Sequence, residues 1–342
     1  MDKLVVRGGR KLQGQVRISG SKNSALPILA ATLLTPEECI IHNVPNLSDI
    51  RHMIDILRHV GAEVDFDRDT GTVRVKAEKV TCEAPYELVR KMRASICVLG
   101  PLLARCGEAR ISLPGGCVIG DRPIAMHIKG IQALGAKVKT EGGNIVARGH
   151  QLLGTEIFLG GKFGSTVLGT DNVLMAASMA DGYTMIDSAA CEPEVKDLAD
   201  FINKMGGQIT GHGTRRIEVE GVKSLHGGEH TVIPDRIEAG TFMIASLITD
   251  GDVELLDVDC THLSNVIERM KACGATFENT GPRLRVNNPR RLSSLDLVTE
   301  TYPGFPTDMQ AQVCALMAVT PGLSVVTDKI FPNRYMLLSE LK

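Results

Sequence analysis

The chain has 342 residues, enough for about two domains, and its 43% hydrophobic and 23% charged residues are ordinary for a soluble globular protein. A net charge of −2 gives no electrostatic case for nucleic-acid binding, and no apolar run is long enough to span a membrane. The nine cysteines lack metal-ligand spacing, which argues against a disulfide or zinc framework. The N-terminus lacks the apolar core of a signal peptide, and together these features indicate a cytoplasmic protein.

One pattern recurs about every sixty to seventy residues and predicts a repeated structural unit. In each unit a helix of small apolar residues precedes a strand, a second helix that ends in glycine, and two further strands. The second helix carries one apolar stripe with the same spacing in four copies. The stripe residues are Ile50, Met53, Ile54, Leu57 and Val60; Ile124, His127, Ile128, Ile131 and Leu134; Val195, Leu198, Ala199, Ile202 and Met205; and Leu263, Val266, Ile267, Met270 and Cys273. We expect the glycine that follows each stripe to end its helix in the left-handed conformation.

The first helix of the unit is expected in five places, at residues 24–32, 94–104, 172–180, 239–248 and 307–319. Three units make one domain, residues 21–229, and the polar, glycine-containing stretch 223–230 marks its end. Residues 1–20 and 230–342 form the second domain, with one full unit and part of another. On the same template the last helix would reach its glycine just beyond Lys342, so we expect this domain to be incomplete at the C-terminus.

A glycine-rich loop at residues 113–123 carries Cys117 and Arg122 and leads into a predicted helix. Glycine lets the backbone approach a ligand closely, a helix start offers N–H donors to an anion, and a nearby arginine lowers the pKa of a thiol. The loop therefore indicates an anion site with a reactive thiol. A glycine turn with a small buried cysteine explains the same residues equally well.

Lys22 with Asn23, and Arg93, also stand at predicted helix starts, where cations suit phosphate or carboxylate. From spacing alone, a solvated lysine beside a capping asparagine and an arginine in a surface ion pair explain them better. His127 takes a stripe position that is apolar in the other three helices, where a histidine is usually a hydrogen-bonded core residue. Because it follows Arg122 by five residues, we favour a role facing the substrate or supporting the loop.

Seven long motifs along the whole chain carry a resemblance to a known family. They lie at residues 19–28, 91–96, 113–123, 192–194, 234–241, 305–312 and 330–336. With these motifs the chain resembles the UDP-N-acetylglucosamine enolpyruvyl transferases, which belong to the EPSP synthase-like proteins. The resemblance implies an α/β fold of two similar domains. Each is an inside-out barrel of βαβαββ units, with the active site in the cleft between them.

The resemblance implies transfer of the enolpyruvyl group of phosphoenolpyruvate to the 3′-hydroxyl of UDP-N-acetylglucosamine, with release of phosphate. This is the first committed step of peptidoglycan synthesis, and the family uses no cofactor or metal; we expect a monomer. The implied catalytic residues are Cys117 as the acid at the methylene carbon or in product release, and as the fosfomycin target, Asp308 as the base, and Lys22. The implied substrate-binding residues are Lys22, Asn23, Asp49, Arg93, Arg122, His127, Thr166, Thr307, Ile330 and Arg334. Without the motif, Asp308 reads as an ordinary carboxylate at a helix start.

Three positions near the implied nucleotide site need comment. Asp49 begins the second helix of the first unit, with Asn46 as its expected cap. Ala125 stands where the family usually has an acid, and Leu168 stands where the segment 166–170 usually has a glycine. Lys162, Gly164 and Ser165 are candidates to compensate for that change.

Two alternatives stay open. The shikimate-pathway enolpyruvyl transferases share the fold, but they have Lys-Ser where this chain has Lys22-Asn23, and they lack the cysteine loop. The other alternative is a non-catalytic homologue that keeps sugar-nucleotide binding. It is motivated by two further family arginines that have no counterpart here, and for this reason we expect little transferase activity from the 342-residue chain itself.

Overall fold

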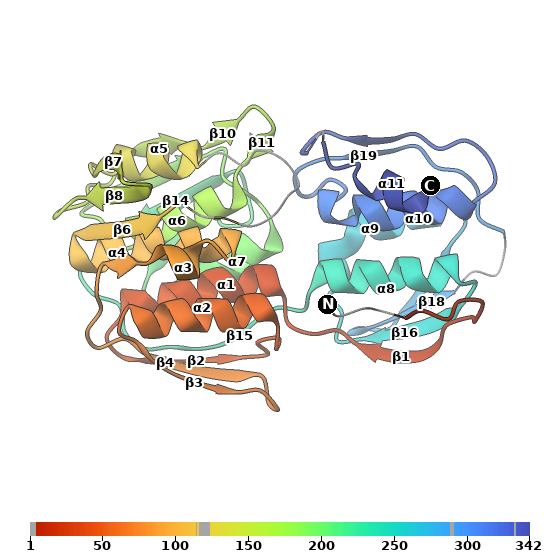
Figure 1. Cartoon of the computed structure of the whole chain (residues 1–342), viewed down its shortest axis with the longest axis horizontal. Coiled ribbons are helices and arrows are strands. Elements are labelled where there is room, and N and C mark those ends of the chain that lie inside the picture. The colour runs from red at the N-terminus through yellow and green to blue at the C-terminus, as the bar shows by residue number, and fades with distance from the viewer. Residues whose placement is uncertain (1–4, 114, 116–123, 288–290, 332) are drawn as a thin grey trace. The chain divides into compact units, whose positions relative to one another are not determined.

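The computed structural model describes residues 5–113, 115, 124–287, 291–331 and 333–342, and Figure 1 shows the course of the chain. By its internal contacts the chain divides into two compact units, one of Gly20–Ile233 and one of Met1–Ser19 with Pro234–Lys342. The sequence predicts boundaries after residues 20 and 229. Each unit is described by itself below.

The unit Gly20–Ile233 contains three copies of the repeated structure. The first comprises α1 (Lys22–Ala31), β2 (Glu38–His42), α2 (Ser48–His59), β3 (Glu63–Asp67) and β4 (Thr72–Lys76). The second comprises η2 (Arg93–Val98), α4 (Leu99–Cys106), β6 (Glu108–Ser112), α5 (Ala125–Ala133), β7 (Lys137–Glu141) and β8 (Asn144–Arg148). The third comprises α6 (Val167–Ala177), β12 (Tyr183–Asp187), α7 (Pro193–Lys204), β13 (Gln208–Thr210) and β14 (Arg216–Glu220).

Each copy builds one four-stranded sheet with the same topology. A short extra strand, β15 (Glu229–Thr231), β5 (Glu83–Ala84) or β9 (Glu156–Phe158), pairs in parallel with the first strand of the copy. The two later strands of each copy complete the sheet in antiparallel pairing. The orders are β15-β2-β4-β3, β5-β6-β8-β7 and β13-β14-β12-β9.

The other unit repeats the same plan. Its full copy comprises α8 (Arg236–Ile248), β16 (Asp252–Leu256), η3 (Cys260–Leu263), α9 (Ser264–Ala272), β17 (Thr276–Asn279) and β18 (Arg283–Asn287). The strand β1 (Gln13–Arg17) pairs in parallel with β16, and the sheet order is β1-β16-β18-β17. A further part follows, with β19 (Leu297–Thr299), η4 (Thr307–Met309), α10 (Gln310–Val319), β20 (Val326–Asp328) and α11 (Leu337–Leu341). The predicted repeat is therefore confirmed at the level of its helices and strands.

The predicted helix ends are also confirmed. Gly61, Gly135, Gly206 and Gly274 have φ of 104°, 93°, 98° and 106°, the left-handed conformation that a side chain disfavours. The stripe residues of α2 and α7 are buried, as the shared spacing requires. The first helices α1 and α6 are buried almost throughout, and in Figure 1 the sheets of this unit lie outside them.

Three local predictions need correction. The helix expected at 94–104 is a 3₁₀ segment, η2, followed by α4 from Leu99, because Pro101 has no N–H to donate to the carbonyl of Cys97. The helix expected at 172–180 begins at Val167, since the Thr166 hydroxyl caps it. Asn46 does not cap α2: the helix begins at Ser48 and its N-cap position is Leu47, and the Asn46 side chain accepts a hydrogen bond from Arg51 instead.

The apolar core is divided between the two units. One cluster of buried residues runs from Ala25 to Val232, and the other comprises Ile18 with residues from Ala239 onward. In the described part of the chain, no helix is both long and apolar enough to cross a membrane.

Candidate active site

The first cluster of predicted site residues lies at the starts of α1 and α2. Lys22 and Asn23 are the first residues of α1, and Asp49 lies in the first turn of α2. The Lys22 ammonium is 3.1 Å from the Asp49 carboxylate, and both side chains are partly exposed. No side chain caps α1, and the start of a helix can offer N–H donors to a ligand. A cation and helix N–H donors together suit an anionic ligand.

His127 is buried on α5, with only 4% of its surface exposed. Its Nδ1 lies 3.0 Å from the Asn172 side-chain amide, which also donates to the Ile96 carbonyl. The Asn172 carbonyl accepts from the Gly100 N–H. Because the amide donates, Nδ1 is the acceptor, and His127 carries its proton on Nε2. The position is that of a hydrogen-bonded core histidine; a direct contact with substrate stays a prediction.

Arg93 and Thr166 stand at the starts of η2 and α6, the elements that contribute Ile96 and Asn172 to the hydrogen bonds around His127. Arg93 is half-buried at the first residue of η2, which contacts α1 and α6. The Thr166 hydroxyl accepts from the Gly169 N–H at 3.3 Å and is thereby used to cap α6. Leu168 packs partly against the core and Ala125 is exposed at the first residue of α5. The role of these positions in nucleotide binding stays a prediction.

Sequence reasoning missed a buried acidic residue beside this cluster. Asp171, in the second turn of α6, is 1% exposed, and its Oδ1 has no hydrogen-bond partner among the described residues. Burial, with the nearby Glu192 and Glu194 carboxylates as a further cause, raises the pKa of Asp171 well above its ordinary value. The polar pair Asp171-Asn172 inside an otherwise apolar helix was the signal in the sequence.

The second cluster lies in the other unit, where η4 and the turn after β20 meet. The Arg334 guanidinium donates to Asp308 Oδ1 at 2.7 Å and to the Thr307 hydroxyl at 3.3 Å. Arg334 is 22% exposed and Asp308 45% exposed, so the arginine is held while the carboxylate stays accessible. The structure therefore brings Arg334 to two residues that lie 26 and 27 positions before it in the sequence.

Asp328, which sequence reasoning also missed, is buried and holds this cluster by hydrogen bonds. Its carboxylate accepts from the Thr307 hydroxyl at 2.6 Å and from the backbone N–H groups of Ile330 and Phe331. It is 5% exposed. An aspartate at the last position of a strand, followed by a turn, is the signal that could have found it. Ile330, a predicted binding residue, is thus placed by its backbone.

Cys117 and Arg122 lie outside the described residues. Of the cysteines that the structure describes, all eight are free thiols: Cys39, Cys82, Cys97, Cys106, Cys191, Cys260, Cys273 and Cys314. Within the described ranges, no three His, Cys, Asp or Glu side chains are grouped so that they could hold a metal ion.

Comparison with known proteins places this geometry in a family. The family profile of EPSP synthase (3-phosphoshikimate 1-carboxyvinyltransferase) matches residues 6–342. A UDP-N-acetylglucosamine 1-carboxyvinyltransferase of Methylacidiphilum infernorum is 58% identical over 342 residues, which are 100% of this chain and 81% of the relative. The chain belongs to the UDP-N-acetylglucosamine 1-carboxyvinyltransferase family. Another family member, from Akkermansia muciniphila, is 53% identical over 345 residues and is covered to the same 81%.

Solved structures show the fold that goes with this family. The enolpyruvyl transferase NikO from Streptomyces tendae superposes with a TM-score of 0.88 at 21% identity, covering 98% of this chain and 79% of that one. EPSP synthase from Acinetobacter baumannii superposes with a TM-score of 0.69 at 20% identity, covering 93% and 74%. The chain therefore has the mixed α/β fold of the enolpyruvyl transferases.

Proposed function

We propose that this chain transfers the enolpyruvyl group of phosphoenolpyruvate to the 3′-hydroxyl of UDP-N-acetylglucosamine and releases phosphate. This reaction is the first committed step of peptidoglycan synthesis. The observation that carries the proposal is the 58% identity to the Methylacidiphilum infernorum 1-carboxyvinyltransferase across the entire chain. The clusters at Lys22 and at Asp308 support it, since both present charges suited to anionic substrates.

In the proposed reaction the sugar hydroxyl oxygen bonds to C2 of phosphoenolpyruvate. Asp308, accessible and held by Arg334, takes the hydroxyl proton, while Cys117 gives a proton to C3. The adduct then loses a proton from C3, the C2–O bond to phosphate breaks, and the double bond forms again. The net change is exchange of the hydroxyl proton for the enolpyruvyl group, with phosphate as the leaving group.

Binding of the two anionic substrates falls to the cations in this proposal. Lys22, Arg93 and Arg122 hold phosphate and carboxylate groups, with the first N–H groups of α1 as further donors. Asn23, Asp49, His127 and Thr166 complete the binding residues of one unit, and Thr307, Ile330 and Arg334 those of the other.

We also propose the finer features that the family implies. Each unit is built as an inside-out barrel of βαβαββ copies, and the protein acts as a cytoplasmic monomer without a cofactor. Phosphoenolpyruvate is a metabolite of the cytoplasm, which supports that location. Light scattering during size-exclusion chromatography measures the oligomeric state.

The decisive experiment compares two acceptors. Phosphate release from phosphoenolpyruvate is measured with UDP-N-acetylglucosamine, with shikimate 3-phosphate and with no acceptor. The two family arginines without a counterpart here predict a slow absolute rate, so the ratio of rates between acceptors decides. We expect release above the no-acceptor background with the sugar nucleotide alone. Calorimetric titration with the same two acceptors gives the matching comparison for binding. Preference for shikimate 3-phosphate in either measurement would overturn the assignment.

A further inference from the structure

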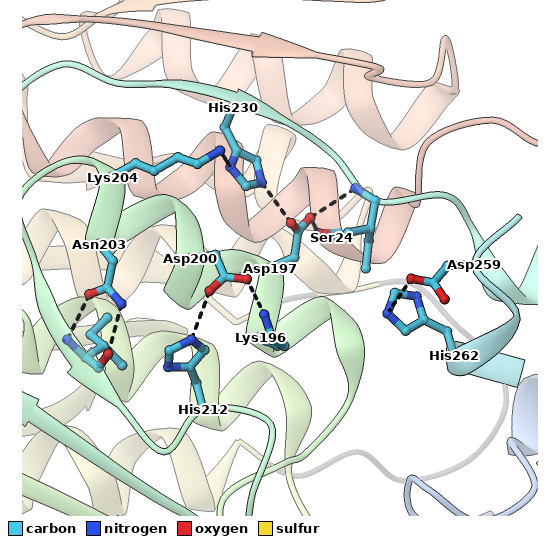
Figure 2. A network of polar contacts seen from close by, with 12 residues as sticks. Ser24, Lys196, Asp197, Asp200, Asn203, Lys204, His212, His230, Asp259 and His262 are labelled. Carbon is cyan, nitrogen blue, oxygen red and sulfur yellow. Dashed lines mark hydrogen bonds and ion pairs between the residues drawn. The ribbon is translucent and has the colours of Figure 1, made fainter. Parts of the chain in front are cut away.

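A buried polar network joins α1, α7 and β15 around Asp197 (Figure 2). Asp197 is 4% exposed and accepts three hydrogen bonds. The Ser24 hydroxyl and the Ile233 N–H donate to Oδ2, and the His230 ring lies 2.8 Å from Oδ1. Ser24 is fully buried in the first turn of α1, directly after Lys22 and Asn23. The carboxylate therefore links the turn that carries two proposed substrate-binding residues to a distant part of the chain.

Two local bonds that often hold the first turn of a helix are missing from α1. Its N-cap residue Ser21 makes no side-chain cap, although the Ala25 N–H reaches the Ser21 carbonyl. Pro27 lies inside the helix and has no N–H, so the carbonyl of Asn23 lacks its helical donor. With a cap and a helical bond both missing, the hydrogen bond from Ser24 to Asp197 becomes a main anchor of the turn.

Asp197 anchors the end of this unit at the same time. Ile233 is its last residue, and the chain passes into the other unit at Pro234. The Ile233 N–H donates to Asp197, and its carbonyl accepts from the Ser21 N–H at 2.8 Å. The Asp197 carboxylate is thus bonded to Ile233 on one side of this backbone contact and, through Ser24, to the α1 turn on the other side.

The remaining oxygen of Asp197 is held by a histidine of defined tautomer. The Lys204 ammonium is 3.1 Å from His230 Nδ1, and an ammonium can only donate. Nδ1 is therefore the acceptor, and the proton on Nε2 faces Asp197. The His230 ring also packs against Phe201, with ring centroids 5.5 Å apart.

We propose that Asp197, through Ser24, is a positioning residue that holds the Lys22–Asn23 turn in the geometry that binds the substrate. The inference rests on the proposed function, because it takes Lys22 and Asn23 as binding residues. Asp197 itself touches no substrate; it acts through the turn that it anchors.

The test measures calorimetric affinity for UDP-N-acetylglucosamine on folded protein, with thermal unfolding recorded beside it. We expect Ser24→Ala and Asp197→Asn each to weaken binding about 10- to 100-fold, since a displacement of about 1 Å can cost about 100-fold in function. The matched control is Asp200→Asn on the same helix. Asp200 also pairs with a histidine, His212 at 2.9 Å, and with Lys196, and none of these contacts involves α1 (Figure 2). The affinity of Asp200→Asn for UDP-N-acetylglucosamine should equal that of the wild type.

A double-mutant cycle with Lys22→Ala separates positioning from general loss of stability. If Ser24 acts through the turn, Ser24→Ala should change affinity less than about twofold once Lys22 is removed. The inference would be overturned if the effects of Ser24→Ala and Lys22→Ala on the binding free energy were fully additive. It would also be overturned if Ser24→Ala and Asp197→Asn bound as tightly as Asp200→Asn. Failure of the wild type to bind UDP-N-acetylglucosamine would instead count against the proposed function.

Discussion

At the scale of single residues, burial sets the chemistry of the thiols. Cys39, Cys97 and Cys273 are buried, and burial raises the pKa of each, to about 11 for Cys39. The partly buried Cys106 and Cys314 are shifted in the same direction by the same cause. A raised pKa removes the thiolate that reacts with electrophiles.

We therefore predict that Cys117 is the most reactive of the nine cysteines. Iodoacetamide below one equivalent, followed by peptide mass mapping, should label Cys117 first. Burial keeps the thiols whose pKa is raised protonated at neutral pH, whereas Arg122, five residues along the chain, favours the Cys117 thiolate. Labelling in urea provides the control, where all nine should react alike. First labelling of any other cysteine would contradict the prediction.

Asp171 allows a prediction about pH. Because its pKa is raised in the folded protein, the fold keeps a proton that the unfolded chain releases above the ordinary value of 3.8. The contribution of Asp171 to stability therefore falls as pH rises above that value. Asp171→Asn should be more stable than the wild type, by a margin that grows from about pH 4 to pH 7 in urea unfolding.

Asp67 supplies the control of opposite sign. Hydrogen bonds from Thr70 and from the Asp69 backbone lower the pKa of this exposed carboxyl, so its contribution is lost as pH falls. Asp67→Asn should show no advantage that grows with pH. An Asp171→Asn margin independent of pH would mean that Asp171 is ionised in the folded protein.

Arg334 tests the cluster at Asp308. Arg334→Lys keeps the charge but replaces the planar guanidinium, whose Nη1 donates to both Asp308 and Thr307, with an ammonium on a different stem that does not reproduce this geometry. We expect kcat/KM for phosphate release to fall about 100-fold, as for loss of one preorganised donor. Arg285→Lys is the control, because Arg285 pairs with Asp252 at an exposed position. Equal kcat/KM in the two variants would remove Arg334 from the site.

At the scale of elements, the apolar stripe and its closing glycine predicted four helices and their ends, because both depend on local spacing and local backbone conformation. The break at Pro101 is also a local effect, and the missing N–H could have predicted it. The prediction that Asn46 caps α2 was wrong for another reason. The position of the loop before α2 decides whether Asn46 or Leu47 is the N-cap residue, and the local sequence does not fix that position.

The closing glycines yield a paired prediction. Gly135 has φ of 93° and no described atom within 4 Å of an added Cβ, so Gly135→Ala should cost about 1–2 kcal/mol for the left-handed conformation alone. At Gly61 the added Cβ would lie 2.6 Å from the Lys79 carbonyl oxygen, so Gly61→Ala should cost more. Denaturant unfolding of both variants measures the loss in free energy of unfolding. An equal loss would show that residues 79–80 move away from the added Cβ without cost.

At the scale of the whole molecule, the two apolar clusters share no residue, and each belongs to one unit. The chain passes between the units at Ser19–Gly20 and at Ile233–Pro234. Separate cores favour separate cooperative units in unfolding.

We predict that core truncations act on one unit each. Leu255→Ala in β16 should remove about 2–5 kcal/mol from the unit that contains it and leave hydrogen exchange in the other unit unchanged. Ile186→Ala in β12 should do the reverse; both side chains are fully buried. Hydrogen exchange followed by mass spectrometry measures both. Equal loss of protection across the chain in either variant would mean one cooperative unit.

The sequence by itself determined the repeat, its helices and strands, the closing glycines and the family, because periodic burial, backbone conformation and long motifs are written locally in the chain. It also named Lys22, Asp49, Asp308 and Arg334, which the structure pairs as Lys22 with Asp49 and Arg334 with Asp308. Only the tertiary structure revealed Asp171, Asp197 and Asp328. The local sequence marks Asp171 only as a polar residue in an apolar helix and Asp328 only as an aspartate before a turn. Their importance comes from burial and, for Asp197 and Asp328, from partners in other elements of the fold, such as Ser24 and His230, which lie 173 and 33 positions from Asp197.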